Sequence, residues 1–191
     1  MGKSTAGKML HRLGLPLYDA DAAVHRLLGY GGRAVAEIDA AFPGVVVGGT
    51  VDRGKLGAVV FSNPAALRKL EGIIHPKVRK ATLKFLQCHA RRRSAIVVLD
   101  IPLLFETGGE GACDAIAVVS APTFVQTARV MARPGMTADR LSKIRAQQMA
   151  DSEKCRRADF VIHTGLGKAD TLRQLQSMLT ILQTNAANSK Q

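Results

Sequence analysis

A continuous run of apolar residues, Ala95–Leu99, ends in an acidic residue, Asp100. A strand that is apolar at every position is typical of a parallel sheet that is covered on both faces. Residues 115–119 and 160–162 have the same character, and stretches of helical spacing separate them. This alternation favours an α/β fold with right-handed crossovers. A chain of 191 residues is long enough for one such domain with a small appended lobe.

The other elements follow from apolar spacing and from the positions of glycine and proline. We expect a short strand at 15–18, and a helix from Pro76 onward because proline suits the first turn of a helix. The many glycines of residues 29–72 favour a loop-rich lobe, and the last dozen residues a frayed tail. The expected helices cover residues 4–13, 21–28, 34–41, 56–61, 123–133, 138–149 and 169–182.

Cysteine usage and the absence of long apolar segments indicate a cytoplasmic protein. The longest apolar runs are strand-length, far below the roughly 20 residues of a membrane-spanning helix. The first residues lack the apolar segment of a signal peptide. Cys88, Cys113 and Cys155 are widely spaced and odd in number, which fits neither a disulfide framework nor a zinc site. We therefore expect reduced thiols and no membrane partner.

The net charge of +12 calls for an anionic partner. Nucleic acid is one candidate, because neutralisation of phosphates dominates that kind of binding. Phosphorylated small molecules are another, since they also seek lysine and arginine. Aromatic residues make up only 4% of the chain, with no tryptophan, which makes a base-stacking platform hard to build. Charge alone leaves both classes of partner open.

Four residues at the start, Gly2-Lys3-Ser4-Thr5, directly precede a predicted helix. They match the second half of the phosphate-binding loop Gly-x-x-x-x-Gly-Lys-Ser/Thr. In that loop backbone amides hold phosphates, lysine reaches the β/γ oxygens and the hydroxyl binds Mg²⁺. The first glycine of the motif would fall before Met1. The alternative interpretation of these residues is an ordinary serine helix cap.

Acidic residues close two of the predicted strands. Asp19 and Asp21 follow the first strand, and ligands of open α/β sheets sit beyond the carboxyl ends of strands. Such acids could hold Mg²⁺ and accept a proton from a substrate hydroxyl. A turn with an aspartate helix cap is the alternative. Asp100 has the position of the metal-supporting aspartate of phosphate-loop enzymes, and residues 101–106 after it form an apolar wall that ends in a carboxylate.

A basic segment follows the second buried strand. Arg129 and Arg133 are four residues apart, so they project from the same helix face. Pro134-Gly135 ends that helix, and Thr137 can cap the next. A helical hairpin with inward arginines would make a closing lid that neutralises a transferring phosphoryl group, although a solvated basic face is the alternative. The order of these signals is typical of a nucleoside- or nucleotide-kinase-like protein, and it leaves the phosphate acceptor open.

Over essentially its whole length the chain resembles the dephospho-CoA kinases. The Asp-Ala-Asp, His-Pro and Pro-Leu-Leu-Phe-Glu stretches, in this order, are highly specific to that family. The segments that carry the resemblance are 2–5, 18–25, 59–61, 75–78, 98–106, 126–133 and 157–162.

The resemblance implies transfer of the ATP γ-phosphoryl group to the ribose 3′-hydroxyl of dephospho-CoA, with ATP and Mg²⁺ as cofactors. It implies a single domain over 1–191 with a three-layer α/β/α core, a helical CoA-binding lobe at about 22–90 and a lid at about 125–150. It also implies a small-molecule substrate and no nucleic acid. We expect a monomer, with an oligomer left open.

Carried over position by position, the resemblance also implies roles for individual residues. Asp21 would be the catalytic base, with Lys3 and Arg129 assisting phosphoryl transfer. Ser4 and Asp100 would support the metal. The residues implied for ATP binding are Gly2, Lys3, Ser4, Thr5 and Arg133. The residues implied for acceptor binding are Asp19, His75, Pro102, Leu103, Leu104 and Glu106.

The sequence departs from the family pattern at its start, because members normally carry an apolar strand and Thr-Gly before this point. Loss of that strand would leave neighbouring backbone groups unpaired, at about 1–3 kcal/mol each. A domain has only about 5–15 kcal/mol of stability. We therefore expect the native protein to be longer and this chain to be unstable or inactive. The alternatives are an inactive remnant of this kinase, another small-molecule phosphate-loop kinase, and a basic nucleic-acid-binding protein.

Overall fold

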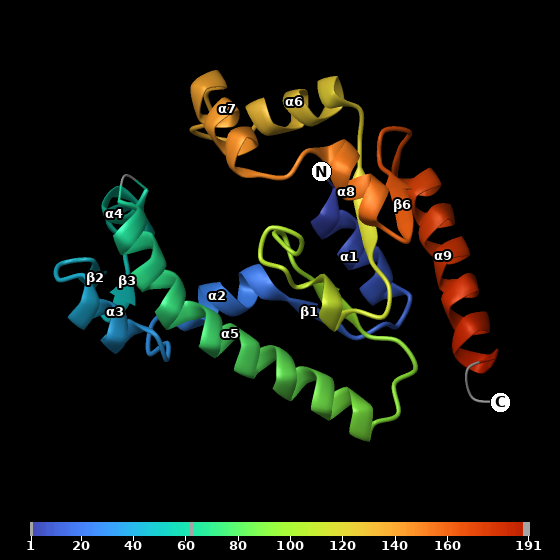
Figure 1. Ribbon diagram of the computed structural model, residues 1–191, viewed down its shortest axis with the longest axis horizontal. Helices are drawn as coiled ribbons and strands as arrows, with labels where there is room; N and C mark the ends of the chain where they lie inside the picture. The colour runs from blue at the N-terminus through green and yellow to red at the C-terminus, as the bar shows by residue number, and fades with distance from the viewer. Residues whose placement is uncertain (1, 62, 189–191) are drawn as a thin grey trace. The chain divides into compact units, whose positions relative to one another are not determined.

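The chain contains both helices and strands in the computed structural model, which describes residues 2–61 and 63–188 (Figure 1). In chain order the elements are α1 (Lys3–Arg12), β1 (Leu17–Asp19), α2 (Ala20–Leu28), α3 (Val35–Ala41), β2 (Val46–Val47), β3 (Thr50–Val51), α4 (Arg53–Val60), α5 (Pro64–Arg91), β4 (Val98–Asp100), a 3₁₀ turn (Glu110–Ala112), β5 (Ala117–Ser120), α6 (Thr123–Met131), α7 (Ala138–Gln147), α8 (Asp151–Arg157), β6 (Phe160–His163) and α9 (Lys168–Asn188).

The elements group into two units. The terminal unit comprises residues 1–17 and 100–191, and the central unit comprises residues 18–99. The strands pair as β1 with β4, β2 with β3, and β5 with β6. Within the described residues 2–61 and 63–188, no helix is both long and apolar enough to cross a membrane.

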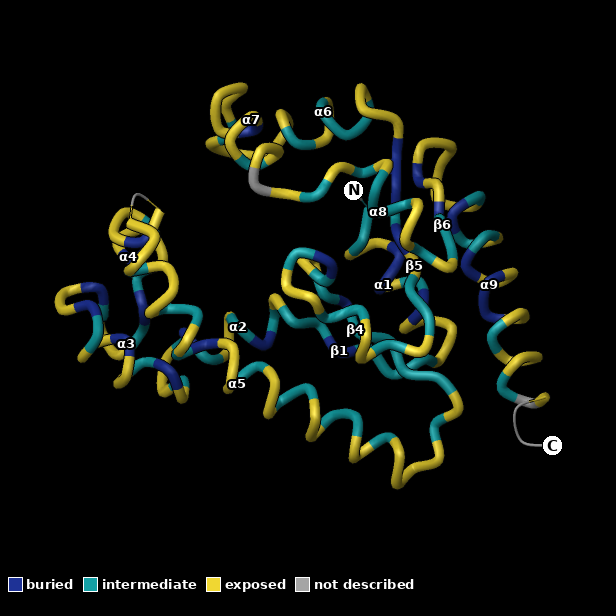
Figure 2. Tube along the Cα trace, in the orientation of Figure 1, coloured by how far each residue is buried: buried dark blue, intermediate teal, exposed yellow. Residues whose placement is uncertain are grey.

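The central unit has a hydrophobic core of its own, built by α3, the β2–β3 hairpin and α4 against the first half of α5 (Figure 2). Ala34 and Ile38 of this core are fully buried. The segment 29–72 is therefore less loop-rich than predicted. Its glycines serve tight turns instead: Gly48 and Gly49, with φ of 56° and 74°, make the two-residue turn of the antiparallel hairpin.

The long helix α5 corrects the prediction of a helix beginning at Pro76. The helix begins twelve residues earlier, because the side-chain oxygen of Asn63 accepts hydrogen bonds from the amides of Ala65 and Ala66 and Pro64 occupies the first turn. Pro76 lies inside the helix, where it cannot donate to the carbonyl of Gly72. One lost backbone bond is tolerated because α5 packs along α2, α3 and α4.

The terminal unit contains the parallel pair that the apolar runs predict. Strands β5 and β6 pair from Ala117 opposite Phe160 to Ser120 opposite His163, so both carboxyl ends lie at one edge. Helix α8 packs against β5, and α9 packs against both β6 and α1. The predicted α/β character is confirmed. Helix α8 was not predicted, and α9 continues to Asn188 where a frayed tail was expected, while the last three residues of that tail lie outside the described part.

Candidate active site

The first turn of α1 presents backbone amides at a glycine that no other residue could replace easily. Gly2 adopts φ 99°, a left-handed conformation, and its carbonyl accepts the amides of Thr5 and Ala6 at 2.9 Å. A Cβ on Gly2 would lie 3.0 Å from Cγ2 of Thr164. Ser4 and Thr5 are exposed in this turn. Such a helix start can bind an anion through its free amides, provided that further groups enclose the anion.

Lys3 and Asp100 meet in the terminal unit. The Nζ atom of Lys3 lies 2.6 Å from Oδ1 of Asp100, and the Asp100 side chain is only 7% exposed. The pair joins the first turn of α1 to the last residue of β4. The strand-ending acid thus lies beside the glycine-lysine-serine segment, whose Ser4 the resemblance pairs with it as a metal-supporting group.

A pocket of about 330 Å³ opens beside this helix start. It is enclosed by the first turn of α1, by Arg129 of α6 and by the turn that joins β6 to α9. Arg133 also lines it, but from the turn that follows α6, because the helix ends at Met131 and not at residue 133 as predicted. The lining residues are Gly2, Thr5, Arg129, Arg133, Thr164, Gly167, Lys168 and Thr171. The pocket combines the start of a helix with three cationic side chains, Arg129, Arg133 and Lys168, so it suits a phosphorylated ligand.

Arg129 is held in this pocket by one residue. Its Nη2 donates to the backbone carbonyl of Thr164 at 2.8 Å, and its Nη1 donates to the Thr164 hydroxyl at 3.2 Å. At the start of α6, Gln126 donates to the carbonyl of Ala121 at 2.8 Å. The structure thus brings Gly2, Thr5, Arg129 and Arg133 together, as the sequence analysis expected.

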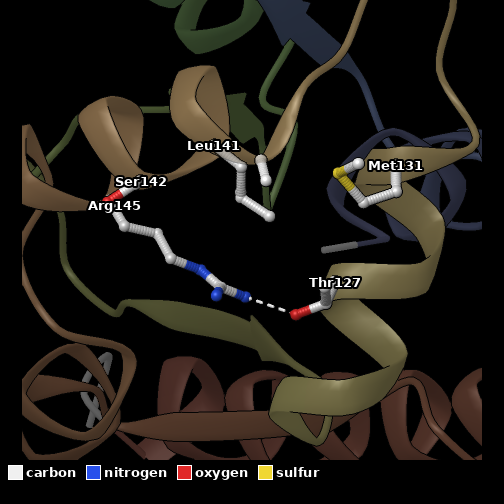
Figure 3. Close-up of a pocket in the computed structure, with 6 residues that line it drawn as sticks. Thr127, Met131, Leu141, Ser142 and Arg145 are labelled. Atoms are coloured by element: carbon white, nitrogen blue, oxygen red, sulfur yellow. Dashed lines mark hydrogen bonds between the residues drawn. The ribbon is translucent and has the colours of Figure 1, made fainter.

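Helices α6 and α7 form the predicted helical hairpin. Pro134-Gly135 lies in the turn between them, and the hydroxyl of Thr137 caps α7 by accepting the amide of Arg140. A second, mainly apolar pocket of about 430 Å³ lies between the two helices (Figure 3). Arg145 bridges them by donating to the hydroxyl of Thr127 at 2.8 Å. Arg145 therefore serves the internal structure of the hairpin.

The apolar wall after β4 is a series of turns over residues 102–108. Pro102 and Leu103 are exposed, while Leu104 is half-buried. Glu106 accepts the amide of Met149 at 3.1 Å and pairs with Lys154 at 2.7 Å, with its side chain 16% exposed.

Two opposing effects set the pKa of Glu106. Burial alone would raise it, but the hydrogen bonds from Lys154 and from the Met149 amide, with the charge of Lys154, outweigh burial and hold the pKa below its ordinary value. Glu106 is therefore an ionised carboxylate that ties the wall to the segment between α7 and α8.

The remaining predicted residues belong to the central unit. Asp19 caps α2 by accepting the amide of Ala22 at 2.9 Å, which confirms the cap interpretation for one of its oxygens. Asp21 is exposed in the first turn of α2. His75 is exposed on α5, which packs against α2.

Sequence reasoning missed the turn after β6. Thr164, Gly167, Lys168 and Thr171 all line the pocket, but none was singled out. The available signal was the glycine-rich stretch 164–167 directly after a buried strand, because loops at the carboxyl ends of parallel strands are where ligands bind.

Comparison with known proteins decides the family. The sequence model of the family described as dephospho-CoA kinase matches residues 1–169. The chain is 62% identical over 154 residues to the dephospho-CoA kinase of Paramagnetospirillum magneticum, covering 81% of this chain and 73% of that protein. It is 52% identical over 185 residues to that of Rhodospirillum rubrum, covering 95% and 86% respectively. The chain belongs to the dephospho-CoA kinase family.

Solved structures agree with this membership. A dephospho-CoA kinase from Campylobacter jejuni matches with a TM-score of 0.71 at 27% identity, covering 96% of this chain and 93% of that one. A crystal structure of a Thermus thermophilus protein matches with a TM-score of 0.80 at 38% identity, covering 95% and 92%. The predicted α/β phosphate-loop kinase fold is therefore confirmed, and the chain is an ATP-dependent kinase of the dephospho-CoA kinase family.

Proposed function

We propose that the protein transfers the γ-phosphoryl group of ATP to the 3′-hydroxyl of dephospho-CoA, giving ADP and coenzyme A. Family membership supports this activity. The observation that carries it is the pocket in the terminal unit, which is lined by the first turn of α1, by Arg129 of α6 and by Arg133 just after the end of that helix. In phosphoryl transfer the protein mainly positions the reactants and stabilises charge. A helix start and two arginines can perform both tasks on a phosphate group.

The first turn of α1 and the basic pocket would bind the nucleotide. Gly2 and Ser4 would supply backbone amides to the phosphates, Thr5 its exposed hydroxyl, and Lys3 a cation. Arg133 would bind ATP, and Arg129 would neutralise charge that develops on the γ-phosphoryl group. Lys168 and Thr171, which line the same pocket, extend this nucleotide site.

The donors next to Lys3 fit Mg²⁺. Asp100 offers a buried carboxylate within 2.6 Å of Lys3, and Ser4, the next residue, offers an exposed hydroxyl. Carboxylate and hydroxyl oxygens are the donors that Mg²⁺ takes in nucleotide kinases. When bound, the ion neutralises charge on the β- and γ-phosphate oxygens. Ser4 and Asp100 would hold it.

The acceptor would be activated by Asp21. Its carboxylate takes the proton of the 3′-hydroxyl while that oxygen attacks the γ-phosphorus. The bond from the γ-phosphorus to the bridging oxygen breaks, and ADP leaves with the electron pair. Asp19, His75, Pro102, Leu103, Leu104 and Glu106 are the residues proposed to bind the acceptor.

The larger organisation is part of the same proposal. Residues about 22–90 would form the CoA-binding lobe and residues about 125–150 the lid of one functional domain over 1–191. We place the enzyme in the cytoplasm, acting as a monomer on a small-molecule substrate. The hydrophobic core of the central unit supports the proposal of a separately packed lobe.

Product identification tests the activity. The chain, and a version extended upstream by the expected first strand, are each incubated with Mg²⁺ and ATP, and with dephospho-CoA, adenosine, AMP or no acceptor. The products are separated by mass. We expect coenzyme A to form only in the dephospho-CoA reaction. Phosphorylation of adenosine or AMP at a higher rate would favour another small-molecule kinase and contradict the proposal.

A further inference from the structure

Thr164 connects the end of the parallel strand pair to the arginine of the lid hairpin. It follows β6, and only 7% of its surface is exposed. Its amide donates to the carbonyl of Ser120 at 2.8 Å, and its hydroxyl lies 3.1 Å from the same oxygen. The Thr164 hydroxyl donates its hydrogen to the Ser120 carbonyl. The lone pairs of the hydroxyl oxygen can therefore accept hydrogen bonds from other donors. Thr164 is thus anchored to the end of β5 by two bonds.

The same residue receives Arg129 through two oxygens. The hydroxyl and the carbonyl of Thr164 accept Nη1 and Nη2 of the guanidinium, at 3.2 Å and 2.8 Å. A guanidinium that is held at two nitrogens keeps both its position and the direction of its plane. Otherwise a long arginine side chain on an exposed helix samples many rotamers.

Thr164 also defines where this arginine lies relative to the phosphate-binding helix start. Its Cγ2 is 3.0 Å from the position that a Cβ on Gly2 would occupy. Gly2, Thr164 and Arg129 line the same pocket. The buried threonine therefore contacts both the loop glycine and the lid arginine within one unit.

We infer that Thr164 is a positioning residue of this kinase, which holds the guanidinium of Arg129 in the orientation that ATP requires. The inference rests on the proposed nucleotide site and adds a residue that the phosphate-binding motif and the lid motif do not contain. Its hydroxyl acts through Arg129. The competing explanation is that the hydroxyl only ties the ends of β5 and β6 together, in which case its removal would act regardless of Arg129.

A double-mutant cycle separates these explanations. Thr164→Val removes the hydroxyl and keeps the shape, and we expect it to lower kcat/KM for ATP by about threefold to tenfold, since one of two charge-assisted bonds is lost. The KM for dephospho-CoA should stay within about twofold. Thr164→Ser keeps the hydroxyl and should restore the ATP value. In an Arg129→Ala background, Thr164→Val should lower kcat/KM for ATP by less than about twofold.

Controls make each outcome decisive. Thr82→Val removes another half-buried hydroxyl, which donates to the Val78 carbonyl within α5, and should leave kcat/KM for ATP unchanged. Thermal melting identifies variants that do not fold, and Arg129→Lys, which cannot engage both oxygens, then probes the same contact from its other side. The inference would be overturned if Thr164→Val lowered kcat/KM for ATP by the same factor with and without Arg129. Failure of Thr164→Ser to restore activity would also overturn it.

Failure of the proposed function gives a different result. The kinase proposal would be contradicted if neither this chain nor a version extended upstream by the expected first strand formed coenzyme A. Calorimetric titration of the same variants with ATP then still tests Thr164, because the cycle applies to dissociation constants as it does to kcat/KM. Coupling between Thr164 and Arg129 in ATP binding supports the inference, and additivity overturns it.

Discussion

Lys3 reaches Asp100 across the terminal unit, with Nζ of the lysine 2.6 Å from Oδ1 of a carboxylate that is 7% exposed. The lysine is the more accessible partner, with 35% of its side chain exposed. An ion pair with one buried and one accessible member can exchange the accessible cation for another charge when a ligand arrives. In the proposed site Lys3 would contact the phosphates and Asp100 would help to hold Mg²⁺.

Asp100→Asn tests that role. The substitution keeps the shape and removes the charge, so we expect kcat to fall by about a hundredfold because a metal-supporting group is lost. Stability should change by about 1 kcal/mol or less, since no buried charge is left unpaired. Steady-state kinetics and urea unfolding measure the two effects.

Asp139→Asn is the matched control for that experiment. Asp139 pairs with Lys143 at 2.9 Å, but both side chains are about three-quarters exposed. Its loss should leave kcat unchanged. Equal losses of activity in the two variants would contradict a special role of Asp100.

Gly2→Ala should weaken ATP binding. The residue has φ 99°, and an added Cβ would lie 3.0 Å from Thr164, so the variant suffers both backbone strain and a clash inside the pocket. Gly14→Ala separates these effects, because Gly14 has φ 88° with no atom within 4 Å of an added Cβ. Backbone strain should cost each variant about 1 kcal/mol of stability. Only Gly2→Ala should raise the dissociation constant of ATP in calorimetry, and an equal effect of both would contradict the pocket geometry.

Ile38→Ala tests the core of the central unit. Ile38 is fully buried among the residues that hold α3 against α5, so its truncation should cost about 2–5 kcal/mol. Leu83→Ala is the control, because Leu83 is 49% exposed on α5 and its truncation should cost about 0.5 kcal/mol or less. Urea unfolding followed by circular dichroism compares the two. Similar midpoints would show that the lobe is not a packed core.

Glu106 gives a prediction about pH. Its pKa in the folded protein lies below the ordinary 4.5, so between these two values the unfolded chain binds more protons than the folded one. The stabilisation that Glu106 provides is therefore complete above about pH 4.5 and is lost as the pH falls through the lowered pKa. Glu106→Gln should destabilise the protein at neutral pH and converge with the wild type in acid. A constant difference in unfolding free energy from acid to neutral pH would contradict this origin.

The sequence predicted the parts of the fold that depend on local pattern. The apolar runs before Asp100, Ser120 and His163 each lead into a strand, β4, β5 and β6, because continuous apolar residues favour buried strands. Residues 95–97 of the first run lie outside β4. The turn at Pro134-Gly135 and the Thr137 cap were also correct, since both depend only on neighbouring residues.

Tertiary contacts explain what the sequence could not show. Pro76 interrupts a helical pattern locally, yet α5 continues through it because packing against three helices outweighs one missing bond. Thr164 looks like an ordinary turn residue, and its role depends on Arg129, thirty-five positions earlier in the chain. A single sequence carries no signal for such a pairing.

The most direct test of the central claim is ADP release from Mg·ATP on addition of dephospho-CoA, measured for the wild type, Asp21→Asn and Asp39→Asn. Asp39 is an exposed acid on α3 and serves as the control for loss of one negative charge. We predict acceptor-dependent turnover that Asp39→Asn retains and that Asp21→Asn loses by at least about a hundredfold, with ATP binding intact. ADP release that does not depend on dephospho-CoA, or that survives in Asp21→Asn, would contradict the account.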